Sequence, residues 1–258
     1  MQETPGGNSG GTDPIGGTPA PATPSPILSK DEGASTVPPH TAAPGASHAT
    51  PGTGTTKPLV ARVRDILMHP NTEWGVIDAE PSTVQSIMMG YVLILAAIGP
   101  LAMLIGQQLF GYSILGVTYR PGLGYSIAMA LMTYIGSVAS TYVLAMVIDA
   151  LAPNFGGTKN MTQAFKVAAY AGTPGWVAGA LLIIPMLGVI SWLGAIYGIY
   201  LIYLGLPRLM RVSADKAVGY TVVAVVVEFV LLVVIGIVVA AIVGSMFPFG
   251  GLSGASIR

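Results

Sequence analysis

Residues 218–246 read VGYTVVAVVVEFVLLVVIGIVVAAIVGSM, and Glu228 is the only charged side chain among them. A helix needs about 20 mostly apolar residues to cross the hydrocarbon core of a bilayer. In lipid, backbone polar groups must be satisfied within the segment itself. An uninterrupted apolar run of this kind therefore predicts a membrane-spanning helix.

Four more apolar runs precede it, at residues 84–110, 125–151, 164–187 and 188–206. The third reaches spanning length only if it includes Lys166. Charged residues make up 9% of the chain, against about 25% in an ordinary soluble domain. The sequence predicts an all-α integral membrane protein, with a bundle of five transmembrane helices over residues 83–247.

The third run is interrupted by Gly172, Pro174 and Gly175, and only a tight turn with Pro185 and Gly188 separates it from the fourth. Proline removes a helix hydrogen bond and kinks the chain. Neighbouring helices can satisfy the freed carbonyl groups, which permits two full crossings. A re-entrant hairpin is the alternative interpretation.

Residues 1–57 are rich in Gly, Pro, Thr and Ser and almost lack large apolar side chains. Such a segment buries too little surface to offset the entropy lost on ordering. We expect a disordered cytoplasmic arm, which serves either as a tether for a partner or as a solvated tail without a specific ligand. Residues 248–258 are expected to form a short C-terminal tail.

Residues 58–82 are predicted to form an amphipathic surface helix, ended by Pro70, and a following loop. A short basic helix beside a membrane span lies in the headgroup layer. The predicted contact surface for a partner or for lipid combines this segment with the inner basic loops. It comprises Arg62, Arg64, Glu73, Trp74, Glu80, Lys159, Arg208, Arg211 and Lys216.

Loop charges orient the predicted bundle, because cytoplasmic loops carry an excess of Lys and Arg. With the N-terminus inside, only Arg120 and Arg258 are left outside. The N-terminus is therefore predicted to be cytoplasmic and the C-terminus outside, in what we expect to be a bacterial inner membrane. The basic residues left inside are Lys57, Arg62, Arg64, Lys159, Lys166, Arg208, Arg211 and Lys216.

Two ionisable residues are predicted to lie within the spans. Glu228 is about 15 Å along its helix, near the middle of a hydrocarbon core about 30 Å thick. A carboxylate there is costly and marks either a proton or cation relay or a hydrogen-bonded packing residue. Asp149 lies at the inner end of the second span, where we expect a structural ion pair with Lys159 or Lys166, with a ligand site as the alternative.

Small residues at four-residue spacing let helices approach closely in a bilayer. Their recurrence predicts a tightly packed bundle, with kinks where proline joins them. The candidate packing or kink positions are Gly99, Pro100, Gly172, Pro174, Gly175, Gly179, Gly194, Gly198, Gly236 and Gly244.

Enzyme constellations are not evident in the sequence. His40 and His48 fall in the N-terminal arm, His69 stands alone, and the chain has no cysteine. We find no paired carboxylates, metal-ligand spacing or nucleophile motif, so we expect no catalytic residue, no cofactor and no metal. The net charge of zero gives no electrostatic basis for a nucleic-acid partner.

Several short motifs follow one another in a fixed order along residues 59–245. They are ILMHPNTEW at 66–74, LAPNFGG at 151–157, AYAGTP at 169–174, YLIYLGLP at 200–207 and DKAVGYT at 215–221. Together they resemble the Yip domain, the family of Ypt/Rab-interacting multi-span membrane proteins, in its prokaryotic branch. The resemblance implies five spans and a cytoplasmic N-terminal arm.

Eukaryotic members of that family are implicated in vesicle traffic through small GTPases of the Rab type. Their Asp-Leu-Tyr-Gly-Pro element near the first span is here AAIGP, at residues 96–100. Because the acidic residue is absent, we do not carry a GTPase partner over to this chain.

We therefore expect a non-enzymatic membrane protein that binds or organises other membrane components, as an adaptor in membrane organisation or trafficking. Its partners would be lipids and other membrane proteins, with a homo-oligomer as a further option. The alternative is a small proton- or ion-coupled transporter or channel centred on Glu228. A third possibility is lipid handling, which fits the surface helix but has no distinguishing residue.

Overall fold

The computed structural model describes residues 57–114, 117–247 and 255–257. The chain divides into two units, Met1–Thr50 and Pro51–Arg258, and every described residue lies in the second. The predicted N-terminal arm, apart from Lys57, and most of the predicted C-terminal tail lie outside the described residues.

Two short helices precede the bundle, α1 (Leu59–Met68) and α2 (Pro70–Ala79). His69 alone separates the end of α1 from Pro70, which is the first residue of α2. Proline suits this position because the first helical N–H has no partner within the helix and the proline φ is already helical. The loop expected after Pro70 is therefore a second helix.

The first apolar segment, Val84–Leu109, is helical but irregular. It consists of α3 (Val84–Ile87), a π-helical turn (Met88–Val92), α4 (Leu93–Ala96) and α5 (Ile98–Leu109). The interruption at Ala97 comes just before Gly99 and the buried Pro100. Proline interferes with the carbonyl of the preceding turn, which accounts for the break.

Long helices follow. They are α6 (Leu123–Leu151), which continues as a 3-10 turn to Phe155, α9 (Gly188–Leu209) and α10 (Ala214–Met246). Within the described residues, four helical segments are long and apolar enough to cross a membrane: Val84–Leu109, Leu123–Phe155, Pro185–Leu209 and Ala214–Met246. The prediction of a multi-pass helical membrane protein is confirmed, with four such segments rather than five.

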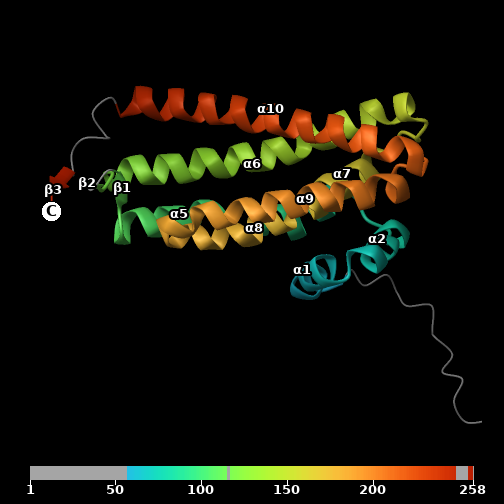
Figure 1. The fold of residues 1–258 in the computed structure, drawn as a ribbon, viewed down its shortest axis with the longest axis horizontal. Coiled ribbons are helices and arrows are strands. Elements are labelled where there is room, and N and C mark those ends of the chain that lie inside the picture. Colours follow the sequence, from blue (N-terminus) through green and yellow to red (C-terminus); the bar gives the residue numbers. More distant parts are fainter. Residues whose placement is uncertain (1–56, 115–116, 248–254, 258) are drawn as a thin grey trace, which may run out of the picture. The chain divides into compact units, whose positions relative to one another are not determined.

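The third predicted span is not among these four because it is broken. It forms α7 (Met161–Ala171), α8 (Thr173–Ala178) and the 3-10 turns Gly179–Ile183 and Pro185–Leu187. The break falls at Gly172, with Pro174 in the first turn of α8. The broken helix packs against α6 and α9 (Figure 1), and α7 is buried from Ala164 to Ala171.

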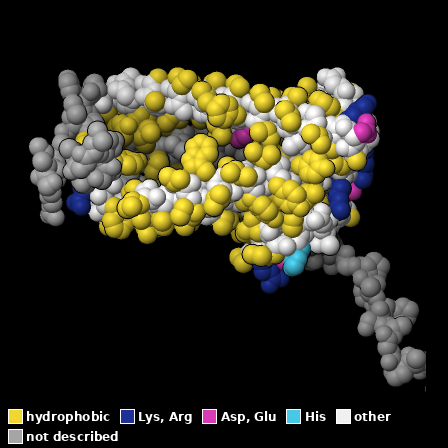
Figure 2. Space-filling view, viewed as in Figure 1, with side chains coloured by type: hydrophobic (Ala, Val, Ile, Leu, Met, Phe, Trp, Pro, Cys, Tyr) yellow, Lys and Arg dark blue, Asp and Glu magenta, His cyan; other side chains and the backbone are white. Residues whose placement is uncertain are grey.

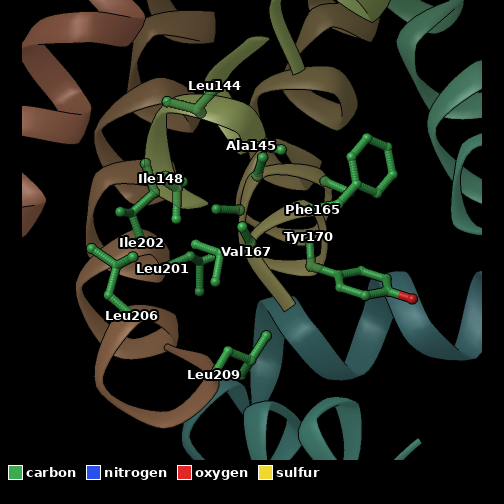
Figure 3. Packing of buried hydrophobic residues seen from close by; sticks show 14 of the residues in the cluster. Leu144, Ala145, Ile148, Phe165, Val167, Tyr170, Leu201, Ile202, Leu206 and Leu209 are labelled. Atoms are coloured by element: carbon green, nitrogen blue, oxygen red, sulfur yellow. The ribbon is translucent and has the colours of Figure 1, made fainter. Parts of the chain in front are cut away.

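At the end of the bundle where α7 lies, a hydrophobic core joins α6, α7 and α9. Val167 points from α7 toward Leu201 of α9, whereas Tyr170 points to the other side of α7 (Figure 3). Leu144, Ala145 and Ile148 of α6 belong to the same cluster (Figure 3). The middle helix α7 therefore presents its two faces to different parts of the protein.

A small antiparallel sheet, absent from the all-α prediction, lies at the opposite end. Its order is β1 (Tyr112–Ile114), β2 (Val117–Tyr119) and β3 (Ala255–Ile257), with Val117 opposite Ile257. Aromatic and β-branched residues favour such strands. The sheet places the described part of the C-terminal tail beside the connection between the first two spans.

The predicted small-residue contacts are present at some positions and not at others. A Cβ added at Gly179 would lie 2.9 Å from the Cα of Gly99, and one at Gly194 would lie 2.5 Å from the carbonyl oxygen of Pro174. Gly198 likewise lies against α7, and Gly172 against Trp176. Among the described residues, no atom lies within 4 Å of a Cβ added at Gly175, Gly236 or Gly244.

Candidate functional site

An ionic network fastens α1 to α2. Arg62 Nη1 donates to Glu73 Oε1 over 2.6 Å, and Arg62 Nη2 donates to Glu80. Lys57 Nζ lies 2.8 Å from Glu73 Oε2 and 2.6 Å from Asp65 Oδ2. Arg62 is 3% exposed, so its charge is held by carboxylates rather than by water. We call these five residues the ionic network.

Hydrogen bonds within this network perturb two of its groups. Bonds to Asp65 and Glu73 raise the pKa of Lys57 above its ordinary value. The bond from Lys57 lowers the pKa of Asp65. Each partner favours the charged form of the other.

Helix α7 is tied to the end of α2. Lys166 Nζ donates to the carbonyl oxygens of Ile77 and Glu80, each over 2.7 Å. Gln163 Nε2 donates to Asp78 Oδ1 over 3.1 Å. A buried ammonium is stable only with such partners, so the lysine at the start of the apolar run becomes a link between α7 and α2.

Aromatic side chains continue from the ionic network into the bundle. The guanidinium of Arg62 lies 5.5 Å from the centre of the Tyr170 ring, which meets the edges of Trp74 and Tyr91. The Tyr91 hydroxyl lies 2.7 Å from Thr173 Oγ1. The π-helical turn that carries Tyr91 is thus joined to the break between α7 and α8.

Helix α9 reaches the same end of the bundle. Arg208 donates to the carbonyl of Asn71, and Arg211 Nη2 lies 3.0 Å from Asp78 Oδ2. The Trp74 ring packs on Gly205, where an added Cβ would lie 2.9 Å from Trp74 Cζ2. Side chains from α1, α2, α7 and α9 therefore meet at one end of the bundle.

Three residues predicted for the contact surface are in fact buried: Arg62 (3% exposed), Glu73 (3%) and Trp74 (0%). This corrects the prediction, and the reason is that α2 folds back on α1 and packs on α9: Glu73 of α2 pairs with Arg62 of α1, and Trp74 packs on Gly205. Glu80 is half-buried and paired with Arg62. Of the predicted set, the exposed members are Arg64, Lys159, Arg208, Arg211 and Lys216.

These exposed cations lie at one end of the bundle, where Figure 2 shows Lys and Arg side chains beyond a predominantly hydrophobic flank. Four acidic groups there, Asp65, Glu73, Asp78 and Glu80, pair with cations, whereas Asp215 beside Lys216 is exposed. Within the described part of the chain, Lys159, Arg208 and Lys216 form no ion pair. We call these three the basic surface.

Glu228 accepts hydrogen bonds from Ser140 Oγ of α6, at 3.1 and 3.2 Å, and no cation pairs with it among the described residues. Asp149 is not paired with Lys159 or Lys166, which corrects the expected ion pair. Lys166 donates instead to the carbonyls of α2, and Asp149 Oδ1 is buried without a hydrogen-bond partner in the described structure.

The described residues contain no group of three or more His, Asp or Glu that could hold a metal ion. The contacts of Lys57, Asp78, Gln163 and Tyr91 were not predicted from the sequence. Lys166 could have indicated that polar partners lie near α7, because a lone cation in an apolar run needs a partner.

Comparisons with known proteins agree with this architecture. The Yip1 domain matches residues 64–251, and the chain belongs to that family. It is 25% identical over 170 residues to the inner membrane protein YohC of Escherichia coli K12, covering 63% of this chain and 85% of the relative. The YohC protein of the O6:H1 strain matches equally. No solved structure matches the chain.

Proposed function

We propose that this protein is a non-enzymatic adaptor that binds acidic surfaces of other membrane proteins through its basic surface. The observation that carries the proposal is the charge imbalance at one end of the bundle. Four acidic groups there, Asp65, Glu73, Asp78 and Glu80, are occupied in internal ion pairs, and Asp215 is exposed. Among the described residues, Lys159, Arg208 and Lys216 are exposed without an ion pair and outnumber the exposed acidic group. Complementary charge gives specificity and fast association.

The proposed topology has five crossings, with the N-terminus in the cytoplasm of a bacterium and the C-terminus outside. Its third crossing is the broken helix. Lys166 of α7 contacts α2 at one end, and a Cβ added at Gly106, near the end of α5, would lie 2.5 Å from the carbonyl oxygen of Ile183. Because α5 ends beside the sheet, these contacts support a full crossing over a re-entrant hairpin.

Capture of the full-length chain from its native membrane in mild detergent tests the adaptor function. We expect a near-stoichiometric membrane protein, which is released by salt because exposed charge pairs are screened. The double variant Lys159→Glu, Lys216→Glu should lose this partner. Arg120→Glu, an exposed cation beyond β2 at the other end, is the matched control and should retain it. Equal recovery of the partner with the wild type, the double variant and Arg120→Glu contradicts the proposal.

A second candidate function is proton- or ion-coupled transport centred on Glu228. The specific observation in its favour is the Ser140–Glu228 contact between α6 and α10. Intramembrane carboxylates commonly mark ion or proton pathways. The two functions differ in their response to Glu228→Gln, as argued in the Discussion.

A further inference from the structure

A cavity of about 330 Å³ lies where the chain leaves α2 and enters the first span. Its polar lining includes Asp78, Ser82, Gln163 and Lys166. Ligand sites are typically about 300–1,000 Å³ with a few convergent polar groups. Ser82 stands two residues before Val84, where the first apolar segment begins, so the cavity is at the level of lipid headgroups.

Two polar atoms at this cavity are buried without a hydrogen-bond partner in the described structure, Ser82 Oγ and Gln163 Oε1. Lys166 is 3% exposed. Two of its three N–H groups are used on the carbonyls of Ile77 and Glu80. Buried polar groups are costly to leave unsatisfied, so the site offers a free hydroxyl, a free ammonium N–H and a free amide oxygen.

This set combines donors with acceptors. The Lys166 ammonium and the Ser82 hydroxyl suit a phosphate oxygen. Gln163 Oε1 accepts only, and the Asp78 carboxylate beside it carries negative charge partly offset by Arg211, 3.0 Å away. A second group on the ligand must therefore donate hydrogen bonds and tolerate a carboxylate. An ammonium with N–H bonds meets both conditions.

We propose that this cavity binds the headgroup of a zwitterionic phospholipid that carries a primary amine, such as phosphatidylethanolamine. The phosphate lies on Lys166 and Ser82, and the ammonium lies on Gln163 and Asp78. A choline headgroup fits less well because its quaternary nitrogen has no N–H for Gln163. The site is separate from the basic surface, and its occupancy does not depend on a protein partner.

Native mass spectrometry of the full chain, titrated with phosphatidylethanolamine, phosphatidylcholine and phosphatidylglycerol, tests the proposal. We expect phosphatidylethanolamine to bind with one saturable site, about tenfold more tightly than the other two lipids, the effect of one hydrogen bond to a charged group. Equal binding of all three lipids overturns the assignment. So does soluble phosphoethanolamine that displaces the lipid at equal concentration, because the occupant would then be a free headgroup.

Ser82→Ala is the sharpest variant because the Ser82 hydroxyl has no hydrogen-bond partner among the described residues. Its melting temperature without added lipid should match the wild type, while its affinity for phosphatidylethanolamine should fall about tenfold. Ser245→Ala, whose hydroxyl donates to Ile242 near the far end of α10, is the matched control and should bind lipid normally. Lys166→Met should also weaken the binding of phosphatidylethanolamine, because its phosphate loses the ammonium, with a lower melting temperature because the bonds to Ile77 and Glu80 are lost. Unchanged lipid affinity in Ser82→Ala overturns the proposal.

Discussion

The Arg62 guanidinium lies 2.6 Å from the Glu73 carboxylate, and both side chains are buried between α1 and α2. A buried ion pair is weak evidence for stability in itself, but the loss of one partner leaves an uncompensated charge. We therefore regard the pair as the contact that fixes the position of α1 on α2.

Glu73→Gln should lower the free energy of unfolding by about 3–5 kcal/mol, because Arg62 then stays buried with one carboxylate fewer. The double variant Arg62→Met, Glu73→Gln should lose less than the sum of its single changes, since neighbouring residues are coupled. Unfolding in detergent measures both. Arg64→Met removes an exposed pair with Asp65 and should change stability by about 0.5 kcal/mol or less. Additive losses would show that the two residues act independently.

Gly205→Ala should weaken the packing of α2 on α9. The added methyl would lie 2.9 Å from Trp74 Cζ2, and overpacking of this kind costs about 1–3 kcal/mol. Gly236→Ala is the matched control, because no described atom lies within 4 Å of its added Cβ. Alanine is the better helix former by about 1 kcal/mol, so the control should be neutral or stabilising. Thermal unfolding of the two variants measures the difference in stability. Equal changes in melting temperature for Gly205→Ala and Gly236→Ala would argue against the Trp74 contact.

Much of the membrane architecture could be predicted from the sequence because hydropathy reports directly on the solvent of a segment. The runs at 84–110 and 218–246 needed no tertiary information. The break at Gly172 was also visible, since Pro174 cannot continue a regular helix ladder. By contrast, Pro70 was ambiguous, because proline both ends one helix and begins the next.

The site was harder to predict because amphipathicity does not say which face meets the protein. Arg62 and Arg64 looked alike in the sequence, yet Arg62 is buried on two carboxylates and Arg64 is exposed. The difference depends on α2 folding back over α1, a contact between segments that no local pattern records. The same limit applies to close helix approach. The small-residue spacing predicted it at Gly175 and Gly236, but no described atom lies within 4 Å of a Cβ added at either position.

The proposed five-crossing topology predicts which residues an impermeant thiol reagent reaches. The chain has no cysteine, so single cysteines can be introduced without background. Met186→Cys, at an 89% exposed position before α9, should react from outside the cell, as should Arg120→Cys. Lys159→Cys should react only after permeabilisation. Protection of Met186→Cys in intact cells, with Arg120→Cys labelled, would establish the re-entrant alternative.

The link between Lys57 and Asp65 predicts a defined dependence on pH. The pKa of Lys57 is raised from 10.5 by its bonds to Asp65 and Glu73, so its contribution is complete below that pH and is lost as pH rises through the folded-state pKa. The pKa of Asp65 is lowered from 3.8 by Lys57. Its contribution is present above 3.8 and is lost as pH falls through the lower folded-state value.

Hydrogen exchange of α1, corrected for the intrinsic rate, should therefore be constant between about pH 5 and pH 9 and should accelerate in acid. Lys57→Met should accelerate exchange across the neutral range and reduce the acid dependence, because Asp65 loses its partner. If Lys57→Met keeps the acid dependence of the wild type, that dependence arises from a group other than Asp65.

Glu228→Gln separates the adaptor from the transporter. Ser140 Oγ lies 3.1 and 3.2 Å from the two carboxylate oxygens, and the amide carbonyl of glutamine can still accept its hydrogen bond. Stability should therefore change by about 1 kcal/mol or less. An adaptor should keep its partner, since the basic surface is unchanged, whereas a coupled transporter should lose flux because glutamine cannot exchange a proton.

Partner capture and ion flux into proteoliposomes measure the two outcomes on the same purified variant. Ser140→Ala is the informative companion, because it leaves the carboxylate in place but removes its only hydrogen-bond donor within the described residues. If the Ser140–Glu228 contact only holds α6 against α10, Ser140→Ala should destabilise the protein more than Glu228→Gln does. The reason is that a carboxylate left unsatisfied in the membrane is costlier than a satisfied amide. A folded Glu228→Gln protein that keeps its partner but has lost a measurable wild-type flux would instead assign Glu228 to transport.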